Sequence, residues 1–318
     1  MSLLSTAIHA VQQAQIACIN VQNTFITSVS KEDRSPVTIA DFAAQSIVSM
    51  ILEEYDAAIP LVGEEDAQLL RENEDLQQKV CSVVHAVLPQ KTKEEILNAI
   101  DRGTHEGGEN GTFWVLDPID GTKGFLRKQQ YAIALGLVEN GNVTLGVLGC
   151  PNLPRDLNAP DQSIGSLFFA TKGGGSFRWL SSEESEPISV SNNPLRFCES
   201  VEKGHSSHSR SQQIADIVGI TAPPIRMDSQ CKYALVAQGQ AAAYLRLTKG
   251  GYVEKIWDHA AGAIIITEAG GVLSDIHGEE LDFSLGRLLQ KNQGVVATSS
   301  ALVHQRVIAA LASTSQRS

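Results

Sequence analysis

The hexapeptide Asp117-Pro118-Ile119-Asp120-Gly121-Thr122 follows an apolar segment and constrains the fold more than any other part of the chain. Residues 113–116 predict a buried strand, which Pro118 should end because proline cannot donate to a sheet ladder. Two carboxylates then leave the strand end, and Gly121 allows backbone to approach a ligand closely. Thr122 should open a helical turn whose free N–H groups suit a phosphate. Since carboxylates repel a phosphate unless a hard cation lies between them, the motif indicates Mg²⁺. An Asp-rich surface turn is the open alternative.

Three more acidic residues extend this pattern along the chain. Glu64 follows a short apolar segment at another expected strand end. Asp258 stands as the expected N-cap of a helix that the apolar run at 263–267 predicts. Asp41 directly precedes a second expected helix, from about residue 42 to residue 55. Taken singly, a pair such as Glu64-Glu65 usually lies on a solvated surface. An aspartate before a helix is usually only its cap.

In this order, the four motifs resemble the metal-dependent, lithium-sensitive phosphomonoesterase superfamily of inositol monophosphatase and fructose-1,6-bisphosphatase. The resemblance runs from about Ser35 to Thr298. It implies an α/β fold class with an α+β N-terminal half, arranged as a layered α-β-α-β-α sandwich of inositol monophosphatase type.

Hydrophobic periodicity predicts helices and strands in an order that suits such layers. Helical spacing covers 4–25, and residues 66–110 read as helices and loops on one edge. Strands are expected at 131–138, 143–148, 167–170, 176–180, 242–247 and 271–273. Asn140-Gly141 is a hairpin signal, and Gly173-Gly174-Gly175 lacks the spacing of a P-loop and reads as a turn. A polar stretch at 181–186 should separate the antiparallel strands expected between residues 131 and 180 from the second half of the chain.

Length and charge limit the function classes. A chain of 318 residues suits one large or two intimately packed domains. A net charge of −11 argues against nonspecific nucleic-acid binding, which requires Lys and Arg to neutralise phosphates. No Lys or Arg precedes Lys31, and no apolar stretch approaches the ~20 residues that span a membrane. We therefore expect a cytoplasmic protein without a nucleic-acid or membrane partner.

The cysteines are scattered and lack CxxC spacing, which indicates reduced, mostly buried thiols: Cys18, Cys81, Cys150, Cys198 and Cys231.

The resemblance implies two or three Mg²⁺ ions at the acidic residues. Glu64, Asp117 and the carbonyl of Ile119 would bind one ion. Asp117 would bridge to a second ion held by Asp120 and Asp258, and a third, weaker ion would bind Glu64 and water. Gathering so many acids without cations would be electrostatically costly, so the cluster itself indicates a metal.

The catalytic residues implied by the resemblance are Thr122 and Asp41. In similar enzymes a threonine hydroxyl, itself hydrogen-bonded to an aspartate, orients and deprotonates the metal-activated water that attacks the phosphate. Thr122 and Asp41 occupy those places in this chain. Helix capping is the alternative for either residue.

The residues after the hexapeptide narrow the resemblance. Inositol monophosphatases usually continue with Thr-Asn, whereas this chain continues with Lys123-Gly124-Phe125-Leu126-Arg127. That segment resembles 3′(2′),5′-bisphosphate nucleotidases, which convert adenosine 3′,5′-bisphosphate to AMP and phosphate. Further matches lie at 201–208, 228–233 and 244–247. One departure is Lys128, where a glycine is common, and it concerns the shape of that loop.

This narrower resemblance implies a nucleotide site. A second phosphate, away from the metals, needs cationic or hydroxyl donors. Matched residue by residue, those that would contact the nucleotide and its 5′-phosphate are His205, Ser229, Lys232 and Arg246. With Gly121, Thr122 and Asp258 they complete the expected substrate-binding set. The alternatives are an exposed polar histidine and ordinary ion pairs of the two cations.

The sequence therefore predicts a monomeric, Mg²⁺-dependent phosphatase that removes the 3′- or 2′-phosphate of adenosine 3′,5′-bisphosphate. The sulfated analogue 3′-phosphoadenosine 5′-phosphosulfate would be a further substrate, in the context of sulfur assimilation and salt tolerance. Residues 1–182 would form an α+β metal-binding domain, and residues 183–318 an α/β domain that completes the nucleotide site. An inositol polyphosphate 1-phosphatase and a non-catalytic adenosine bisphosphate sensor are the alternatives.

Overall fold

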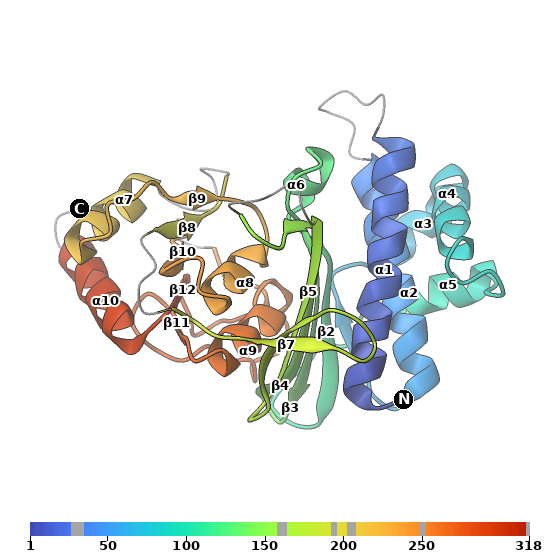
Figure 1. The fold of residues 1–318 in the computed structure, drawn as a ribbon. Coiled ribbons are helices and arrows are strands. Elements are labelled where there is room, and N and C mark those ends of the chain that lie inside the picture. Colours follow the sequence, from blue (N-terminus) through green and yellow to red (C-terminus); the bar gives the residue numbers. More distant parts are fainter. Residues whose placement is uncertain (27–34, 158–163, 192–195, 202–207, 249–251, 316–318) are drawn as a thin grey trace.

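Helices and sheets alternate as five layers in the computed structural model, which describes residues 1–26, 35–157, 164–191, 196–201, 208–248 and 252–315 (Figure 1). Helices α1 (Leu3–Phe25) and α2 (Ser35–Tyr55) cover one face of a seven-stranded sheet. Helices α8 (Cys231–Ala237) and α9 (Ala260–Glu268) lie between this sheet and a five-stranded sheet. The outer face of the second sheet carries α7 (His208–Val218) and α10 (Ala301–Ser315). The predicted α-β-α-β-α sandwich is confirmed.

The seven-stranded sheet follows chain order from β1 to β7. Its strands are β1 (Leu61–Gly63), β2 (Thr112–Asp120), β3 (Ala132–Glu139), β4 (Asn142–Pro154), β5 (Ile164–Thr171), β6 (Gly175–Trp179) and β7 (Ser185–Ile188). Only the β1–β2 pair is parallel within this sheet, and the other pairs are antiparallel. In the predicted hairpin, Asn140 and Gly141 have φ of 48° and 75°, the positive values that a type I′ turn requires.

The expectation that Pro118 ends its strand is wrong, because β2 continues to Asp120. Asp117 pairs with Ala134, and Asp120 pairs with Ala132, so β2 contains one extra residue at this point. A bulge leaves residues outside the ladder, which is why a proline is tolerated there. On a regular strand, residues three apart face opposite sides of the sheet. The bulge therefore brings both aspartates to the same side.

The five-stranded sheet has the order β11-β12-β10-β8-β9. Its strands are β8 (Phe197–Glu199), β9 (Ile225–Arg226), β10 (Ala243–Arg246), β11 (Val272–Ser274) and β12 (Val295–Thr298). The strands predicted at 242–247 and 271–273 correspond to β10 and β11. Along the edge of the first half lie α3 (Gln68–Glu72), α4 (Glu74–His85) and α5 (Lys93–Asp101), as predicted for 66–110.

Three predicted boundaries were wrong. Helix α2 begins at Ser35 rather than near residue 42, so Asp41 lies within the helix and is not its cap. His259 is the N-cap of α9, and Asp258 instead ends a short 3₁₀ turn, η1 (Ile256–Asp258). The polar stretch at 181–186 is not only a separator, since Ser185 begins β7, which pairs with β6. The division of the chain after residue 182 stays a prediction.

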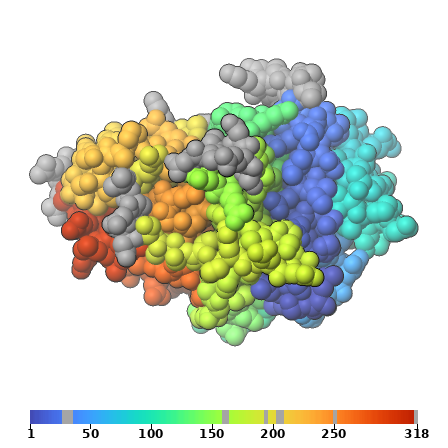
Figure 2. All heavy atoms as spheres, in the orientation of Figure 1, coloured from blue at the N-terminus to red at the C-terminus, as the bar shows by residue number. Residues whose placement is uncertain are grey.

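Figure 2 shows residues from the first hundred, in blue and cyan, at one end of the molecule and the orange and red C-terminal residues toward the other. All five cysteines are free thiols, and only Cys81 is partly exposed. Among the helices that the structure describes, none combines the length and the apolar character needed to cross a membrane.

Candidate active site

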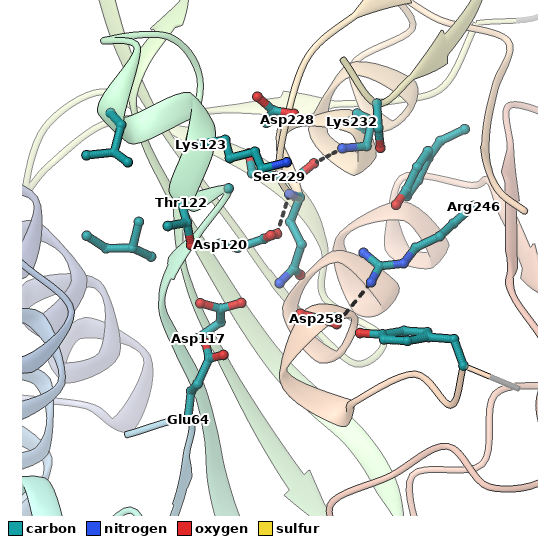
Figure 3. A pocket seen from close by; sticks show the side chains of 17 residues that line it. Glu64, Asp117, Asp120, Thr122, Lys123, Asp228, Ser229, Lys232, Arg246 and Asp258 are labelled. Carbon is teal, nitrogen blue, oxygen red and sulfur yellow. Dashed lines mark hydrogen bonds and ion pairs between the residues drawn. The ribbon is translucent and has the colours of Figure 1, made fainter. Parts of the chain in front are cut away.

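A cavity of about 350 Å³ lies where the end of β2 faces the second half of the chain. In Figure 3, Glu64, Asp117, Asp120 and Thr122 lie on one side of it, and Lys232, Arg246 and Asp258 lie on the other. The sequence-predicted residues that line it are Glu64, Asp117, Ile119, Asp120, Gly121, Thr122, Ser229, Lys232, Arg246 and Asp258. Asp41 is not among the lining residues, and His205 lies outside the described residues.

Strand register places the acidic residues together. Gly63 of β1 pairs with Leu116 of the parallel strand β2, so the residues that follow, Glu64 and Asp117, emerge side by side. The bulge in β2 adds Asp120 on the same side. Carboxylate oxygens of Asp117, Asp120 and Asp258 all lie within 4.8 Å of one another. Three oxygens at this separation are close enough to bind a single cation.

Burial and mutual repulsion disfavour the ionised form of these acids. The pKa of Asp117 lies well above its usual value because the group is buried and because Glu64 and Asp120 are close. Burial and the Asp258 carboxylate raise the pKa of Asp120 to about 6 and that of Glu64 to about 7. Asp117 Oδ1 is buried and accepts no hydrogen bond from any described residue. These features fit a cation that would neutralise the cluster.

The hexapeptide ends at a helix start, as predicted. Thr122 is exposed and is the first residue of α6 (Thr122–Leu126). Gly121 is the N-cap of α6 with a φ of 93°, in the left-handed region that favours glycine. A Cβ atom on Gly121 would lie 2.9 Å from the Cβ of Ser229, so the close approach of the two chain halves also requires glycine. Since Gly121 holds the cap position, capping does not account for Thr122.

Asp41 lies behind the acidic cluster, in α2. Burial, followed by repulsion from Glu65 and Glu64, raises the pKa of Asp41 well above its usual value. Its charge also raises the pKa of Asp117, which places it electrostatically within reach of the cluster. The pairing of the Asp41 carboxylate with the Thr122 hydroxyl stays a prediction.

The loop after α6 contains Lys128, which the sequence analysis noted at a position where a glycine is common. Lys128 has a φ of 55°, so a lysine occupies the left-handed conformation that a glycine adopts without strain. Arg127, beside it, forms an ion pair with the buried carboxylate of Asp228 in the second half. Asp228 also lines the cavity; it belongs to the matched segment 228–233, but the sequence interpretation gave it no role.

Lys232 is a buried cation at the cavity wall. Its side chain is 3% exposed, and its Nζ donates to the carbonyls of Met227 (3.2 Å) and Ser229 (2.7 Å). Nζ also lies 5.0 Å from the centre of the Tyr244 ring. Burial lowers the pKa of Lys232, although the negative charge of Asp120 opposes this. Ser229 has a φ of 70°, and the ammonium stabilises this strained turn through its carbonyl.

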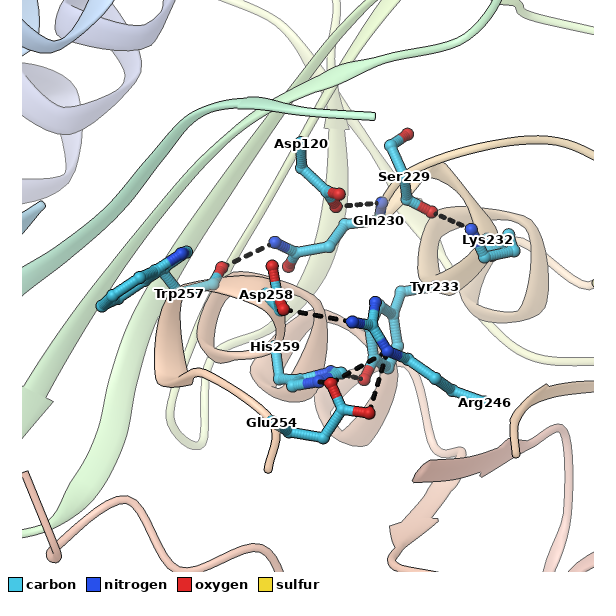
Figure 4. A network of polar contacts seen from close by, with 10 residues as sticks. All are labelled: Asp120, Ser229, Gln230, Lys232, Tyr233, Arg246, Glu254, Trp257, Asp258 and His259. Atoms are coloured by element: carbon cyan, nitrogen blue, oxygen red, sulfur yellow. Dashed lines mark hydrogen bonds and ion pairs between the residues drawn. The ribbon is translucent and has the colours of Figure 1, made fainter. Parts of the chain in front are cut away.

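Arg246 forms ion pairs on the cavity wall. Its Nε lies 2.9 Å from Glu254 Oε2, and its Nη2 lies 3.2 Å from Asp258 Oδ2. Figure 4 shows this network extending through His259, which lies 3.1 Å from Glu254 and 2.8 Å from the Tyr233 hydroxyl. The predicted ion-pair alternative for Arg246 is therefore present, and it coexists with a position on the cavity wall.

Glu254 and His259 were missed by the sequence interpretation. Both are fully buried, and with Asp258 they offer a second group of closely spaced ligand atoms. However, the Glu254 carboxylate already forms an ion pair with Arg246 and a hydrogen bond with His259 Nε2. The other ring nitrogen of His259, Nδ1, forms a hydrogen bond with the Tyr233 hydroxyl. This group is thus a hydrogen-bonded network rather than a second cation site. Their only local signal is their position close to Asp258 in the sequence.

Known proteins resemble this chain in sequence and in fold. A sequence profile of the inositol monophosphatase family matches residues 33–316. A 3′(2′),5′-bisphosphate nucleotidase of Schizosaccharomyces pombe is 43% identical, over 98% of this chain and 95% of that protein. The 3′(2′),5′-bisphosphate nucleotidase 1 of Arabidopsis thaliana is 45% identical, over 84% of this chain and 83% of that protein.

Solved structures agree in fold. Inositol monophosphatase II from Staphylococcus aureus superposes with a TM-score of 0.66 at 21% identity, covering 100% of this chain and 96% of that chain. CysQ from Bacteroides thetaiotaomicron, described as a bacterial member of the inositol monophosphatase family, has a TM-score of 0.60 at 21% identity, covering 93% and 96%. At this identity the likeness concerns the fold alone.

Proposed function

Because the chain belongs to the inositol monophosphatase family, we propose that it is a Mg²⁺-dependent 3′(2′),5′-bisphosphate nucleotidase. It would hydrolyse the 3′- or 2′-phosphate of adenosine 3′,5′-bisphosphate to give AMP and phosphate. The observation that carries this proposal is one cavity that is lined both by a cluster of three carboxylates, Asp117, Asp120 and Asp258, and by the cations Lys232 and Arg246. Relatives that align over most of this chain bear the same enzyme name.

The cluster of carboxylates fits divalent cations. Asp117 keeps a buried oxygen without a hydrogen-bond donor among the described residues, and two further carboxylates lie within 4.8 Å. We assign one Mg²⁺ to Glu64, Asp117 and the carbonyl of Ile119, and a second to Asp117, Asp120 and Asp258. A third, weaker ion would use Glu64. When bound, the ions would neutralise phosphate charge and make water a stronger nucleophile.

Thr122 and Asp41 are the proposed proton-handling residues. The Thr122 hydroxyl, exposed at the cavity wall, would orient the attacking water and take up its proton. Asp41 would accept the proton of that hydroxyl. A carboxylate with a raised pKa is a stronger base, and burial gives Asp41 this property.

The nucleotide would bind across the cavity from the acids. Lys232 uses two of its three ammonium donors on carbonyls, so one donor is left for a phosphate oxygen. Arg246 presents a guanidinium at the cavity wall, and Ser229 adds a hydroxyl. We include His205 in the site on the sequence resemblance.

Phosphate release from a small substrate panel tests the proposal. Purified protein with Mg²⁺ should release phosphate from adenosine 3′,5′-bisphosphate faster than from inositol 1,4-bisphosphate, inositol 1-phosphate or fructose 1,6-bisphosphate. A preference for inositol 1,4-bisphosphate would instead identify an inositol polyphosphate 1-phosphatase. Tight binding of the adenosine bisphosphate without phosphate release would identify a sensor.

The proposal also covers the sulfated analogue 3′-phosphoadenosine 5′-phosphosulfate as a substrate, and sulfur assimilation and salt tolerance as the context. We further propose a cytoplasmic monomer with no nucleic-acid or membrane partner. Adding the sulfated analogue to the substrate panel tests whether it is hydrolysed, and measuring the molecular mass by light scattering tests whether the protein is a monomer.

Lithium should inhibit phosphate release. Li⁺ is small like Mg²⁺ but carries half the charge, so at the site formed by Asp120 and Asp258 it would stabilise departing oxygens poorly. We expect inhibition that is uncompetitive with the nucleotide, measured as parallel double-reciprocal plots at increasing LiCl. KCl at equal ionic strength should not reproduce it, which excludes general screening. Insensitivity to LiCl would contradict the assignment of that site and leave the phosphatase proposal standing.

Replacing Arg246 with alanine should raise KM for adenosine 3′,5′-bisphosphate by about 10-fold, the loss expected for a hydrogen bond to a charged group. Adenosine 3′-phosphate, which lacks the 5′-phosphate, should be much less affected. Because the change also removes one of the two partners of the buried Glu254, thermal unfolding must be measured alongside. Arg246→Lys keeps the charge and serves as the control for folding. Equal losses on both nucleotides would contradict a 5′-phosphate contact.

A further inference from the structure

Arg287 connects two segments that carry proposed metal ligands from opposite halves of the chain. It lies in the loop between β11 and β12, and its Nη2 donates to the carbonyl of Gly63 (2.5 Å). Its Nη1 donates to the carbonyls of Gly103 (3.1 Å) and His105 (3.0 Å). The face of the guanidinium lies against Trp257, with Cζ 4.8 Å from the ring centre. Gly63 directly precedes Glu64, and Trp257 directly precedes Asp258.

The backbone of Arg287 is fixed to the Asp258 segment. The Ile256 N–H donates to the Arg287 carbonyl (3.1 Å), and the Leu289 N–H donates to the Glu254 carbonyl (2.8 Å). Residues 254–256 and 287–289 thus form a short antiparallel ladder, with a bridge between Lys255 and Leu288. This ladder leads directly into the η1 turn that ends at Asp258.

The Glu64 segment is held on both sides. Gly63 donates its N–H to the Gly103 carbonyl (2.8 Å), which also accepts from Arg287. On the other side, Glu65 donates its N–H to Gln45 Oε1 (3.0 Å), and its carbonyl accepts from Gln45 Nε2 (2.6 Å). Gln45 belongs to the first half, whereas the Arg287 side chain hydrogen-bonds this segment to the second half, beside the apolar packing of Val62 against Ile256 and Trp257.

We propose that Arg287 is a positioning residue that fixes the separation of Glu64 and Asp258 and thereby sets the affinity of the metal centre. This inference rests on the proposed function, because it takes both acids as metal ligands. Arg287 does not line the cavity and acts through the residues that precede the ligands. In the part of the chain that the structure describes, no carboxylate forms an ion pair with Arg287, so its donors are committed to carbonyls.

Charge and geometry predict opposite signs for the loss of this side chain. Removing a cation near the acids should, through electrostatics alone, strengthen Mg²⁺ binding. Releasing the Glu64 segment from the Asp258 segment should weaken it, because misplaced ligands no longer share one ion. The direction of the change in Mg²⁺ affinity therefore separates a positioning role from a simple charge effect.

The test is calorimetric titration of Mg²⁺ into the nucleotide-free protein. Arg287→Gln and Arg287→Lys should both raise the Kd for Mg²⁺ by about 10-fold or more, the usual effect of losing a residue that orients metal ligands. Lysine retains the charge but cannot reach several carbonyls with a planar fork, so it should not rescue binding. At saturating Mg²⁺, KM for the nucleotide should stay close to that of the unaltered protein. Circular dichroism establishes that each variant is folded.

Two control variants accompany these changes. Arg306→Gln alters an exposed arginine of α10 and should leave Mg²⁺ affinity unchanged. Lys255→Gln removes the other cation that contacts Trp257, at 4.9 Å, without touching Gly63, and should not weaken Mg²⁺ binding. Unchanged or tighter Mg²⁺ binding by a folded Arg287 variant would overturn the inference about Arg287 and leave the proposed function standing. Absence of Mg²⁺ binding by the unaltered protein would overturn the proposed function with it.

A double variant tests whether Arg287 acts through Glu64. If it does, adding Arg287→Gln to Glu64→Gln should weaken Mg²⁺ binding by less than Arg287→Gln does alone, because residues that act on one contact are not additive. Fully additive losses would mean that Arg287 does not act through Glu64 and would overturn the inference.

Discussion

Asp120→Asn should lower the rate of phosphate release by at least ~100-fold, the scale of losing a key electrostatic contribution in an active site. The carboxylate of Asp120 lies within 4.8 Å of those of Asp117 and Asp258, so it supplies charge where the cations would bind. Asparagine keeps the shape, and its oxygen can still accept the Gln230 N–H, which now lies 2.6 Å from Asp120 Oδ2. The change therefore removes charge with little effect on packing. The measurement is kcat at saturating nucleotide over a range of Mg²⁺ concentrations.

Chelation and a surface variant complete this experiment. Excess EDTA should abolish phosphate release by the unaltered protein, and added Mg²⁺ should restore it. Asp75→Asn, which alters an exposed aspartate paired with Lys79 on α4, should retain full activity. Near-normal turnover in excess EDTA, or by Asp120→Asn, would contradict the metal assignment.

Thr122→Val should lower kcat by about 100-fold, the lower range of what a positioned proton acceptor contributes. Valine has nearly the shape of threonine but lacks the hydroxyl that we assign to the attacking water. Because Gly121 caps α6 without a side-chain hydrogen bond, the helix start should survive the change. Nucleotide affinity, measured by calorimetry, should stay within a few-fold of that of the unaltered protein.

Thr122→Ser provides the matched comparison, since it keeps the hydroxyl and should retain most of the activity. Asp41→Asn should reproduce the Thr122→Val defect if the carboxylate accepts the hydroxyl proton. A collapse of nucleotide affinity with kcat preserved would show that Thr122 binds substrate and does not take part in proton transfer.

Much of the candidate site could be predicted because its acids follow strand ends that have local signals. An apolar segment, a glycine and a carboxylate mark Glu64, and the hexapeptide marks Asp117 and Asp120. The layered arrangement was implied by the family resemblance, while its helices and strands were predicted from helical and period-two patterns, which depend on residues close in sequence. Where two local rules competed, the prediction was wrong: Pro118 continues its strand through a bulge, and Asp258 belongs to a 3₁₀ turn rather than a cap.

The sequence by itself determined the order of the acids, the strands that present them and the residue types suited to a cation and a phosphate. Only the tertiary structure decided which distant groups meet. Arg287 contacts Gly63 across the two halves of the chain, and Arg127 pairs with Asp228 across them as well. Such contacts have no local signature, because they depend on how two sheets and the helices between them pack. Burial then changes the free energy of each charged group. An ionised carboxylate is well solvated in water, but once it is buried it destabilises the fold unless a cation or a hydrogen-bond donor lies beside it.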